Sequence, residues 1–326
     1  MTQPAVSEDE FIEIWNKTGG SASDVSRLIG VGLKNTHTRR RNIEQKRGIQ
    51  LLCRTGSPSS PDTHLADVRP EFPDWQHISI KDGLLVTFSD SHLIPGHRTT
   101  AHRALIKFCK ELQPKACIDN GDLLDFASIS RHHRIGWDKQ LSVAKEIEWA
   151  GDCLEEIKRA LPKACVTRRN QGNHDQRFSG AFSNRMAEFE GVRGTSLDDH
   201  IVGWPCAWAT RVNDDQLEVK HRWKSGVHAP WNNAMNAGIS YATGHAHSQK
   251  IYPLTDLRGD RWGVDIGTLA SVYGPHFRYM EASPRNHRAG FAVFRFVNYK
   301  LRMPELVRVI DEDKGLIEWR GQDYTV

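Results

Sequence analysis

Short apolar segments that end in polar clusters alternate with helical patterns from about residue 83 onward. Helical periodicity occupies residues 102–112 and 137–161, and the strand-like segments between and after them are residues 84–90, 115–122, 164–175, 217–221 and 239–247. This alternation predicts an α/β core whose strands end at one rim. Further strand-like segments lie at residues 261–269, 289–297 and 306–310, and we expect this tail to complete a second sheet.

Residues 8–48 instead carry three short helical patterns. Ser21 or Ser23 can cap the second helix, and the third is expected at about residues 33–46, after a glycine turn. A short helix, a turn and a basic helix give the outline of a helix-turn-helix. Residues 27–54 hold eight Arg or Lys and one acidic residue, a local net charge of +7.

These patterns divide the chain into three parts. A small all-α, helix-turn-helix-like domain is predicted at residues 1–50, a linker at residues 51–80 and an α/β domain at residues 81–326. The linker rests on residues 54–74, which carry four prolines and little apolar periodicity.

Composition narrows the class of protein further. The 326 residues carry a net charge of only +4, so the distribution of charge says more about partners than its total. The six cysteines form no CxxC pair, which argues against a disulfide framework or a thiolate zinc site. No apolar run approaches the ~18 residues of a membrane span, and the polar N-terminus lacks a signal-peptide pattern. We therefore expect a cytoplasmic protein without membrane contact.

Polar clusters with the chemistry of metal ligands end four of the predicted strands. Carboxylate, imidazole and amide groups suit divalent cations, and ligands gather at strand ends in open α/β sheets. In Asp-x-His and His-x-His, residues i and i+2 point to the same side of an extended chain. The clusters are Asp90-Ser91-His92, Gly121-Asp122, Gly172-Asn173-His174-Asp175 and Gly244-His245-Ala246-His247.

In this order, the four motifs resemble the signature of the calcineurin-like metallophosphoesterases, over roughly residues 83–247. The resemblance implies a two-sheet sandwich flanked by helices and a site for two divalent metal ions, with Mn²⁺ favoured and Fe, Zn, Ni or Mg as alternatives. It assigns Asp90, His92 and His247 to the first metal, Asn173, His245 and one further histidine to the second, and Asp122 as a bridge between them. His174 would be the general acid, oriented by Asp175.

The sequence departs from the family pattern at the further histidine, which the family usually follows with a glycine. Neither of the two candidates here precedes a glycine. His221 directly follows a strand-like segment and is preferred, with His228 as the alternative ligand. Asp125 is interpreted as a helix cap or as an acceptor behind the metal ligands.

Other residues are assigned to the substrate. Arg177, His97 and Arg131 are candidates for contacting it near the metals, and His276 is interpreted as structural. In the N-terminal domain, the candidates for binding nucleic acid are Lys34, Arg39, Arg40 and Arg41.

The sequence favours a phosphodiesterase or nuclease that acts on DNA, of a type similar to bacteriophage or prophage proteins. In that case the protein would work in the host cytoplasm. One alternative is a phosphomonoesterase or protein phosphatase with an adaptor domain at its N-terminus. Another is a non-catalytic DNA-binding regulator. The oligomeric state stays open, with a homodimer among the options.

Overall fold

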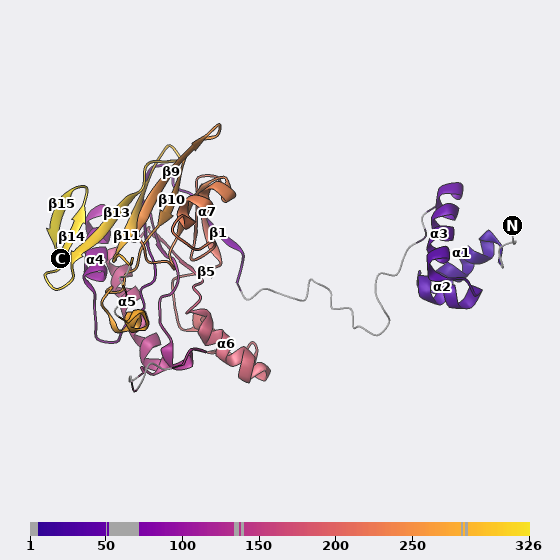
Figure 1. Cartoon of the computed structure of the whole chain (residues 1–326), viewed down its shortest axis with the longest axis horizontal. Coiled ribbons are helices and arrows are strands. Elements are labelled where there is room, and N and C mark those ends of the chain that lie inside the picture. The colour runs from indigo at the N-terminus through magenta and orange to yellow at the C-terminus, as the bar shows by residue number, and fades with distance from the viewer. Residues whose placement is uncertain are drawn as a thin grey trace. The chain divides into compact units, whose positions relative to one another are not determined.

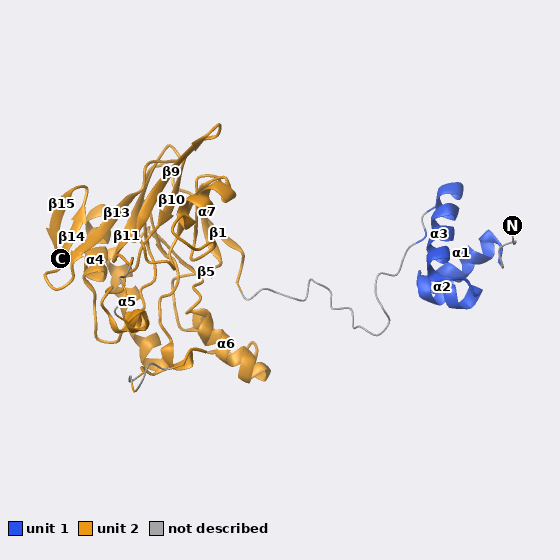
Figure 2. Cartoon of the chain, in the orientation of Figure 1, with its two compact units in different colours: residues 1–70 blue, residues 71–326 orange. Residues whose placement is uncertain are grey.

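The computed structural model divides the chain into two compact units, Met1–Pro70 and Glu71–Val326, which Figure 2 shows in different colours. It describes residues 6–49, 51, 72–133, 137, 140–281, 283 and 286–326. Most of the predicted linker, residues 52–71, lies outside the described residues. Its C-terminal part was assigned wrongly, because Trp75–Ile78 forms strand β1 and pairs with the second unit's β6 (Ala209–Val212).

The first unit consists of three helices at the predicted places, α1 (Glu8–Lys17), α2 (Ala22–Ile29) and α3 (Leu33–Arg47). Ser7 begins α1 with a capping box, and Ser21 caps α2 by accepting a hydrogen bond from the Asp24 amide. The helices bury a small apolar core made of Phe11, Trp15, Val25, Ile29, Ile43 and Leu51.

The second unit contains two β-sheets (Figure 1). Among the described residues, the first sheet has the order β1-β6-β7-β8-β10-β9, and the second has the order β15-β14-β13-β11-β2-β3-β4-β5 with β12 paired to β11. The remaining strands are β2 (Gly83–Phe88), β3 (Ala116–Asp119), β4 (Val166–Asn170), β5 (Cys206–Ala207), β7 (Leu217–Lys220), β8 (Ser240–Thr243), β9 (Lys250–Asp256), β10 (Gly259–Asp265), β11 (Gly290–Val297), β12 (Lys300–Leu301), β13 (Glu305–Asp311), β14 (Leu316–Trp319) and β15 (Gln322–Thr325). The helices are α4 (Thr100–Leu112), α5 (Val143–Ala160), α6 (Gln176–Arg185) and α7 (Ala229–Ala237), with short 3₁₀ turns η2 (Ala127–Ile129), η3 (Ala187–Phe189), η4 (Leu197–Asp199) and η5 (Pro275–Met280).

The two sheets pack face to face, and successive side chains along a strand point alternately between the sheets and toward the helices outside them. Along β2, Leu85 packs into the apolar cluster that both sheets share, whereas Val86 packs with residues of α4 and α5. On the first sheet, α7 packs through Ala234 against Tyr241 of β8. The predicted fold class, a two-sheet α/β sandwich flanked by helices with a small N-terminal helical unit, is therefore confirmed.

One predicted element differs from the structure. The long helix expected from residue 137 begins only at Val143, where Ser142 caps it by accepting a hydrogen bond from the Lys145 amide, and Trp137 lies fully exposed in a turn. The strand-rich tail completes the second sheet as expected through β11 and β13–β15, whereas its strand β10 joins the first sheet.

Five strand ends meet between the sheets. Strands β2, β3 and β4 run parallel in one sheet, and β7 and β8 run parallel in the other. Each is followed by one of the motif loops or by His221. None of the described helices has the length and hydropathy to cross a bilayer.

Candidate metal centre

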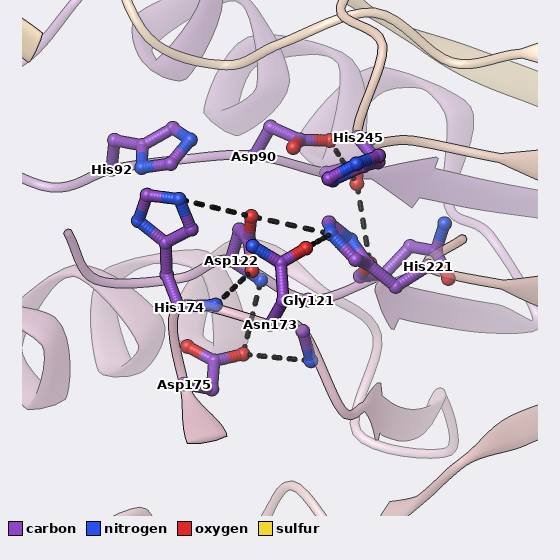
Figure 3. A network of polar contacts seen from close by, with 12 residues as sticks. Asp90, His92, Gly121, Asp122, Asn173, His174, Asp175, His221 and His245 are labelled. Atoms are coloured by element: carbon purple, nitrogen blue, oxygen red, sulfur yellow. Dashed lines mark hydrogen bonds and ion pairs between the residues drawn. The ribbon is translucent and has the colours of Figure 1, made fainter. Parts of the chain in front are cut away.

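Two groups of ligand-type side chains lie at these strand ends, beside a third that consists of His92, Asp125 and His174. One consists of Asp90, His92 and His247, and the other of Asp122, His221 and His245. Within each group the ligand atoms lie within 4.8 Å of one another. Figure 3 shows that the second group and Asn173 converge with Asp90, His92 and His174 on one region.

Five of these six residues have a backbone conformation that L-residues rarely adopt. Their φ angles are positive, at 54° for Asp90, 39° for His92, 53° for Asp122, 65° for His245 and 55° for His247. Such angles in non-glycine residues cost free energy and cluster at functional sites. The tight loops thus aim consecutive polar side chains at one point, which the sequence did not predict.

Two motif glycines permit the close approach of these loops. A Cβ atom at Gly172 would lie 2.0 Å from the Asp122 amide nitrogen, and one at Gly244 would lie 2.2 Å from Asp90 Oδ2. Any side chain at either position would separate the loops that carry the two groups.

Asp90 organises the first group. Its Oδ1 lies 2.8 Å from His247 Nε2, while its Oδ2 accepts hydrogen bonds from the His245 amide at 2.8 Å and Ser89 Oγ at 2.6 Å. Burial opposes ionisation, but the imidazoles of His247 and His221 lower the pKa of Asp90 to about 2. Burial lowers the pKa of His92 to about 4, so this ring is neutral and can offer a lone pair.

Asp122 and His221 form the centre of the second group. Asp122 Oδ2 lies 3.2 Å from His221 Nε2 and 3.9 Å from His174 Nε2, and Asn173 Oδ1 lies 3.1 Å from His221 Nε2. The Nδ1 atom of His221 lies 2.8 Å from the Asn120 carbonyl oxygen, so it donates there and directs Nε2 at the site. Burial opposes protonation, yet Asp122 and Asp90 raise the pKa of His221 to about 10. The carboxylates therefore require a positive charge at this point.

The structure separates the two candidates for the further histidine. His221 is buried within the second group. His228 is exposed, immediately before α7, and its ring packs at 6.4 Å from the ring of Tyr252. It belongs to none of the ligand groups that the described residues form.

His174 is oriented by Asp125 instead of by the predicted Asp175. His174 Nδ1 lies 3.0 Å from Asp125 Oδ1, and this hydrogen bond raises the pKa of His174 although burial opposes it. The Asp175 carboxylate accepts hydrogen bonds from the amides of Asp122, Leu123 and Gly172 at 3.0 to 3.2 Å (Figure 3). Asp175 points inward because these amides need an acceptor, so it positions the loops and not the histidine.

A buried arginine supports Asp175 from behind. Arg169 is fully buried, with Nη1 3.8 Å from Asp175 Oδ2, and it also pairs with Asp198. Sequence reasoning did not separate Arg169 from its neighbour Arg168, because the two arginines differ only in their burial.

The predicted substrate residues differ in their distance from the site. Arg177 Nη2 lies 3.1 Å from His174 Nε2, and Nη1 donates to the Asp125 carbonyl oxygen at 2.6 Å. Arg131 is exposed and is close enough to Arg177 to lower its pKa, although burial is the larger cause. His97 is exposed and lines a pocket next to His92. His276, expected to be structural, lies in that pocket with Nδ1 3.9 Å from Asp125 Oδ2.

The four basic residues predicted to bind nucleic acid fall into two pairs. Arg39 lies over the ring of Phe11 and also bonds to the Val6 carbonyl, and Arg40 lies over Trp15 and 3.5 Å from Glu44. These two side chains therefore hold the helices together. Lys34 and Arg41 are exposed on α3, and neither has an ion pair to any described residue.

Comparisons with known proteins give distant matches. No protein-family model matches the sequence. The Gene 54 protein of Mycobacterium phage D29 is 24% identical over 255 residues, covering 69% of this chain and 93% of that protein. Vps29 of Entamoeba histolytica in complex with zinc matches at 10% identity with a TM-score of 0.41, over 74% of this chain and 98% of that one. A dimetal phosphatase from Danio rerio matches at 10% identity with a TM-score of 0.35, over 75% of this chain and 98% of that one.

Proposed function

We propose that this protein is a metallophosphoesterase that binds two divalent cations and hydrolyses a phosphodiester bond in DNA. The observation that carries the proposal is the convergence of two ligand groups on one region, with His174 beside them. Asp122 Oδ2 lies 3.2 Å from His221 Nε2 of the second group, and Asp122 is near enough to Asp90 and His92 of the first group for their charges to interact, as expected of a carboxylate between two cation sites.

The donors fit divalent cations of the borderline class. Carboxylate oxygens, imidazole nitrogens and an amide oxygen are the ligands that Mn²⁺, Fe²⁺ or Zn²⁺ accept. His92 is buried, its Nδ1 lies 3.5 Å from Asp125 Oδ1, and its Nε2 makes no hydrogen bond to a described residue. A buried ring nitrogen without a partner is costly unless another group takes its lone pair, which a cation would do. Asp90, His92 and His247 would hold one cation, and Asn173, His221 and His245 the other, with Asp122 between them.

The chain's own residues supply the proton chemistry. Bound cations would add Lewis acidity, which polarises phosphoryl oxygens and activates water. His174 is suited to donate a proton to the leaving oxygen, because its hydrogen bond to Asp125 orients the ring and raises its pKa. Arg177, beside His174, would compensate negative charge on the phosphoryl group.

DNA is favoured as the substrate by the first unit. The exposed side of α3 presents Lys34, Asn35, Thr38, Arg41 and Asn42, which are residue types that contact phosphates and base edges. The match to a phage gene product is in line with the bacteriophage type that the sequence suggests. The alternative is a phosphomonoesterase or protein phosphatase that uses the first unit as an adaptor. The two functions differ in whether a phosphodiester or a phosphomonoester is the better substrate.

The test compares a diester with a monoester on the full-length chain loaded with Mn²⁺. We expect bis-p-nitrophenyl phosphate to be hydrolysed with a higher kcat/KM than p-nitrophenyl phosphate, and single- or double-stranded DNA to be cut. A preference for the monoester with intact DNA would favour the alternative. If the protein binds two metal ions but hydrolyses none of these substrates, the proposal that it is a phosphoesterase is wrong.

A further inference from the structure

A pocket opens beside the candidate metal centre and shares only His92 with it. Three segments form its walls: the loop after β2, the first turn of α4 and the loop after β10. The polar side chains that line it belong to Ser91, His92, His97, Thr99, His102, Ser271 and His276.

The lining is rich in hydrogen-bond donors, and no carboxylate belongs to it among the described residues. Ser91 is 3% exposed, and its Oγ makes no hydrogen bond within the described part of the chain. His102 is 1% exposed, and neither ring nitrogen makes a hydrogen bond there, the nearest acceptor being Glu156 Oε2 at 3.5 Å from Nε2. Since buried polar groups normally find partners, these two side chains indicate a polar ligand to which each can donate a hydrogen bond.

The position of the pocket relates this ligand to the metal centre. The His276 ring lies 5.5 Å from the His92 ring between centroids, so the pocket begins next to the first ligand group. The amino end of α4 borders the pocket but is already capped, because the His102 amide donates to Thr99 Oγ1 and the Thr100 amide donates to Glu312 Oε1. The side-chain donors of the lining are therefore what favours a group with several acceptor oxygens.

We propose that the pocket is a second phosphate-binding subsite, which holds the phosphate next to the scissile diester of a nucleic acid strand. This inference rests on the proposed function, because it requires a substrate with neighbouring phosphates. Tyr273 lies in the loop that forms one wall, adjacent to the lining residue Gly274, and is 85% exposed. Its ring offers a surface on which the adjoining base can stack. His276 acts as a positioning residue between the two phosphates.

The first measurement is binding without metal, which separates the subsite from catalysis. The full-length chain, treated with EDTA, is titrated by calorimetry with the dinucleotide TpT and with its 5′- and 3′-phosphorylated forms. One of the two phosphorylated forms should bind on the order of tenfold more tightly than TpT, the typical gain from charge-assisted hydrogen bonds. Equal affinity for all three would overturn the subsite.

Variants identify where the terminal phosphate binds. Ser91→Ala and His276→Asn should each remove most of the ratio between the phosphorylated and unphosphorylated dinucleotides. Ser183→Ala and His77→Asn change the same residue types at exposed or half-exposed positions outside the pocket and should keep the full ratio. An unchanged ratio in both pocket variants would overturn the assignment.

The metal-loaded enzyme gives the second readout. The same phosphorylated dinucleotide should have a lower KM than TpT, whereas bis-p-nitrophenyl phosphate, which lacks a second phosphate, tests only the metal centre. Hydrolysis of bis-p-nitrophenyl phosphate without any effect of a terminal phosphate would refute the subsite and leave the proposed function standing. Failure to hydrolyse either diester would refute the proposed function and this inference with it.

Discussion

The two units of this protein use charged side chains in opposite ways. In the two-sheet unit, Asp90, Asp122 and Asp175 are almost completely buried at strand ends, where backbone amides and imidazoles hold them. In the three-helix unit, charges lie near the surface and pair across helices, as Lys46 does with Glu8 and Arg47 with Glu8 and Asp9. Buried carboxylates cost far more free energy than exposed ones, so they persist where a site requires them.

This contrast shows how a polar sequence motif should be interpreted. A cluster that follows an apolar strand is carried into the interior by that strand, and its chemistry is directed at a site. A run of arginines on a short helix has no such constraint, and its members divide between packing and solvent. Arg39 and Arg40 cover Phe11 and Trp15 through their guanidinium groups, in addition to any role of charge.

Replacing the central buried carboxylate should have the largest effect. Asp122→Ala removes the buried carboxylate of the second group, which also interacts with Asp90 and His92 of the first group, so we expect loss of bound metal and no measurable phosphoester hydrolysis. Metal content by elemental analysis and turnover are measured together, with the exposed Asp215→Ala as the control. Full metal stoichiometry at the wild-type rate would show that Asp122 does not bridge.

His221→Ala and His228→Ala test the choice between the two histidines. His221 lies buried against Asp122 and Asn173, so its loss should remove about one metal ion per chain and most of the activity. His228 is exposed and should leave metal content unchanged, which makes it the matched control. Equal metal loss from both variants would contradict the assignment of His221.

His174→Ala should keep the metals and slow turnover by roughly 10²–10⁴-fold, the usual contribution of a general acid. The loss should be smaller for nitrophenyl esters than for alkyl esters, because a good leaving group needs little protonation. Asp125→Asn should reproduce part of this pattern. The same penalty for both leaving groups would mean that His174 is not the acid.

Much of this site was predictable from sequence because each motif follows an apolar strand. Asp90, His92, Asp122, Asn173, His245 and His247 lie where parallel strands end, and the strands were recognisable by their apolar residues. Parallel strands then bring motifs that are distant in sequence to one edge. Whether these residues bind metal remains a prediction for the experiments above.

Contacts between loops were not predictable in the same way. Asp175 adjoins His174 in sequence, yet its carboxylate turns to three backbone amides, while Asp125 from another loop reaches the imidazole. The positive φ angles of the motif residues could not be predicted either, because the pattern of apolar residues does not depend on them. Strand β1 was missed because its four residues, WQHI, are bounded by the proline-rich stretch and expose one side.

Glu146 allows the free-energy cost of a buried charge in the two-sheet unit to be measured. It is 2% exposed, and burial raises its pKa to about 7 from an ordinary 4.5, although the Phe126 amide donates to it. The folded state therefore binds the proton more tightly than the unfolded state, so ionisation removes stability as pH rises from about 4.5 to about 7. Glu146→Gln should be more stable than the wild type by up to about 3 kcal/mol above pH 7, and the gain should vanish near pH 4.5.

Urea unfolding of the metal-free chain at several pH values measures this gain. Glu148→Gln, on the exposed side of the same helix, is the matched control. A difference between Glu146→Gln and wild type that stays constant with pH would show that Glu146 does not titrate in this range.

The smallest effect is expected from the exposed charges of the three-helix unit. If α3 contacts DNA, Lys34 and Arg41 neutralise phosphates and release counterions, so log affinity falls with log salt by roughly 0.9 per contact. Replacing both residues by Gln should then reduce the slope of log affinity against log salt by about one to two units.

Replacing Arg39 and Arg40 instead should lower the melting temperature of the three-helix unit, because their side chains pack on Phe11 and Trp15. The affinity for duplex DNA, measured at several salt concentrations, distinguishes the Lys34 and Arg41 variants from the Arg39 and Arg40 variants. A salt dependence that Lys34→Gln with Arg41→Gln leaves unchanged would exclude α3 as the DNA-binding surface and favour the adaptor role, while hydrolysis of bis-p-nitrophenyl phosphate would still report on the metal centre alone.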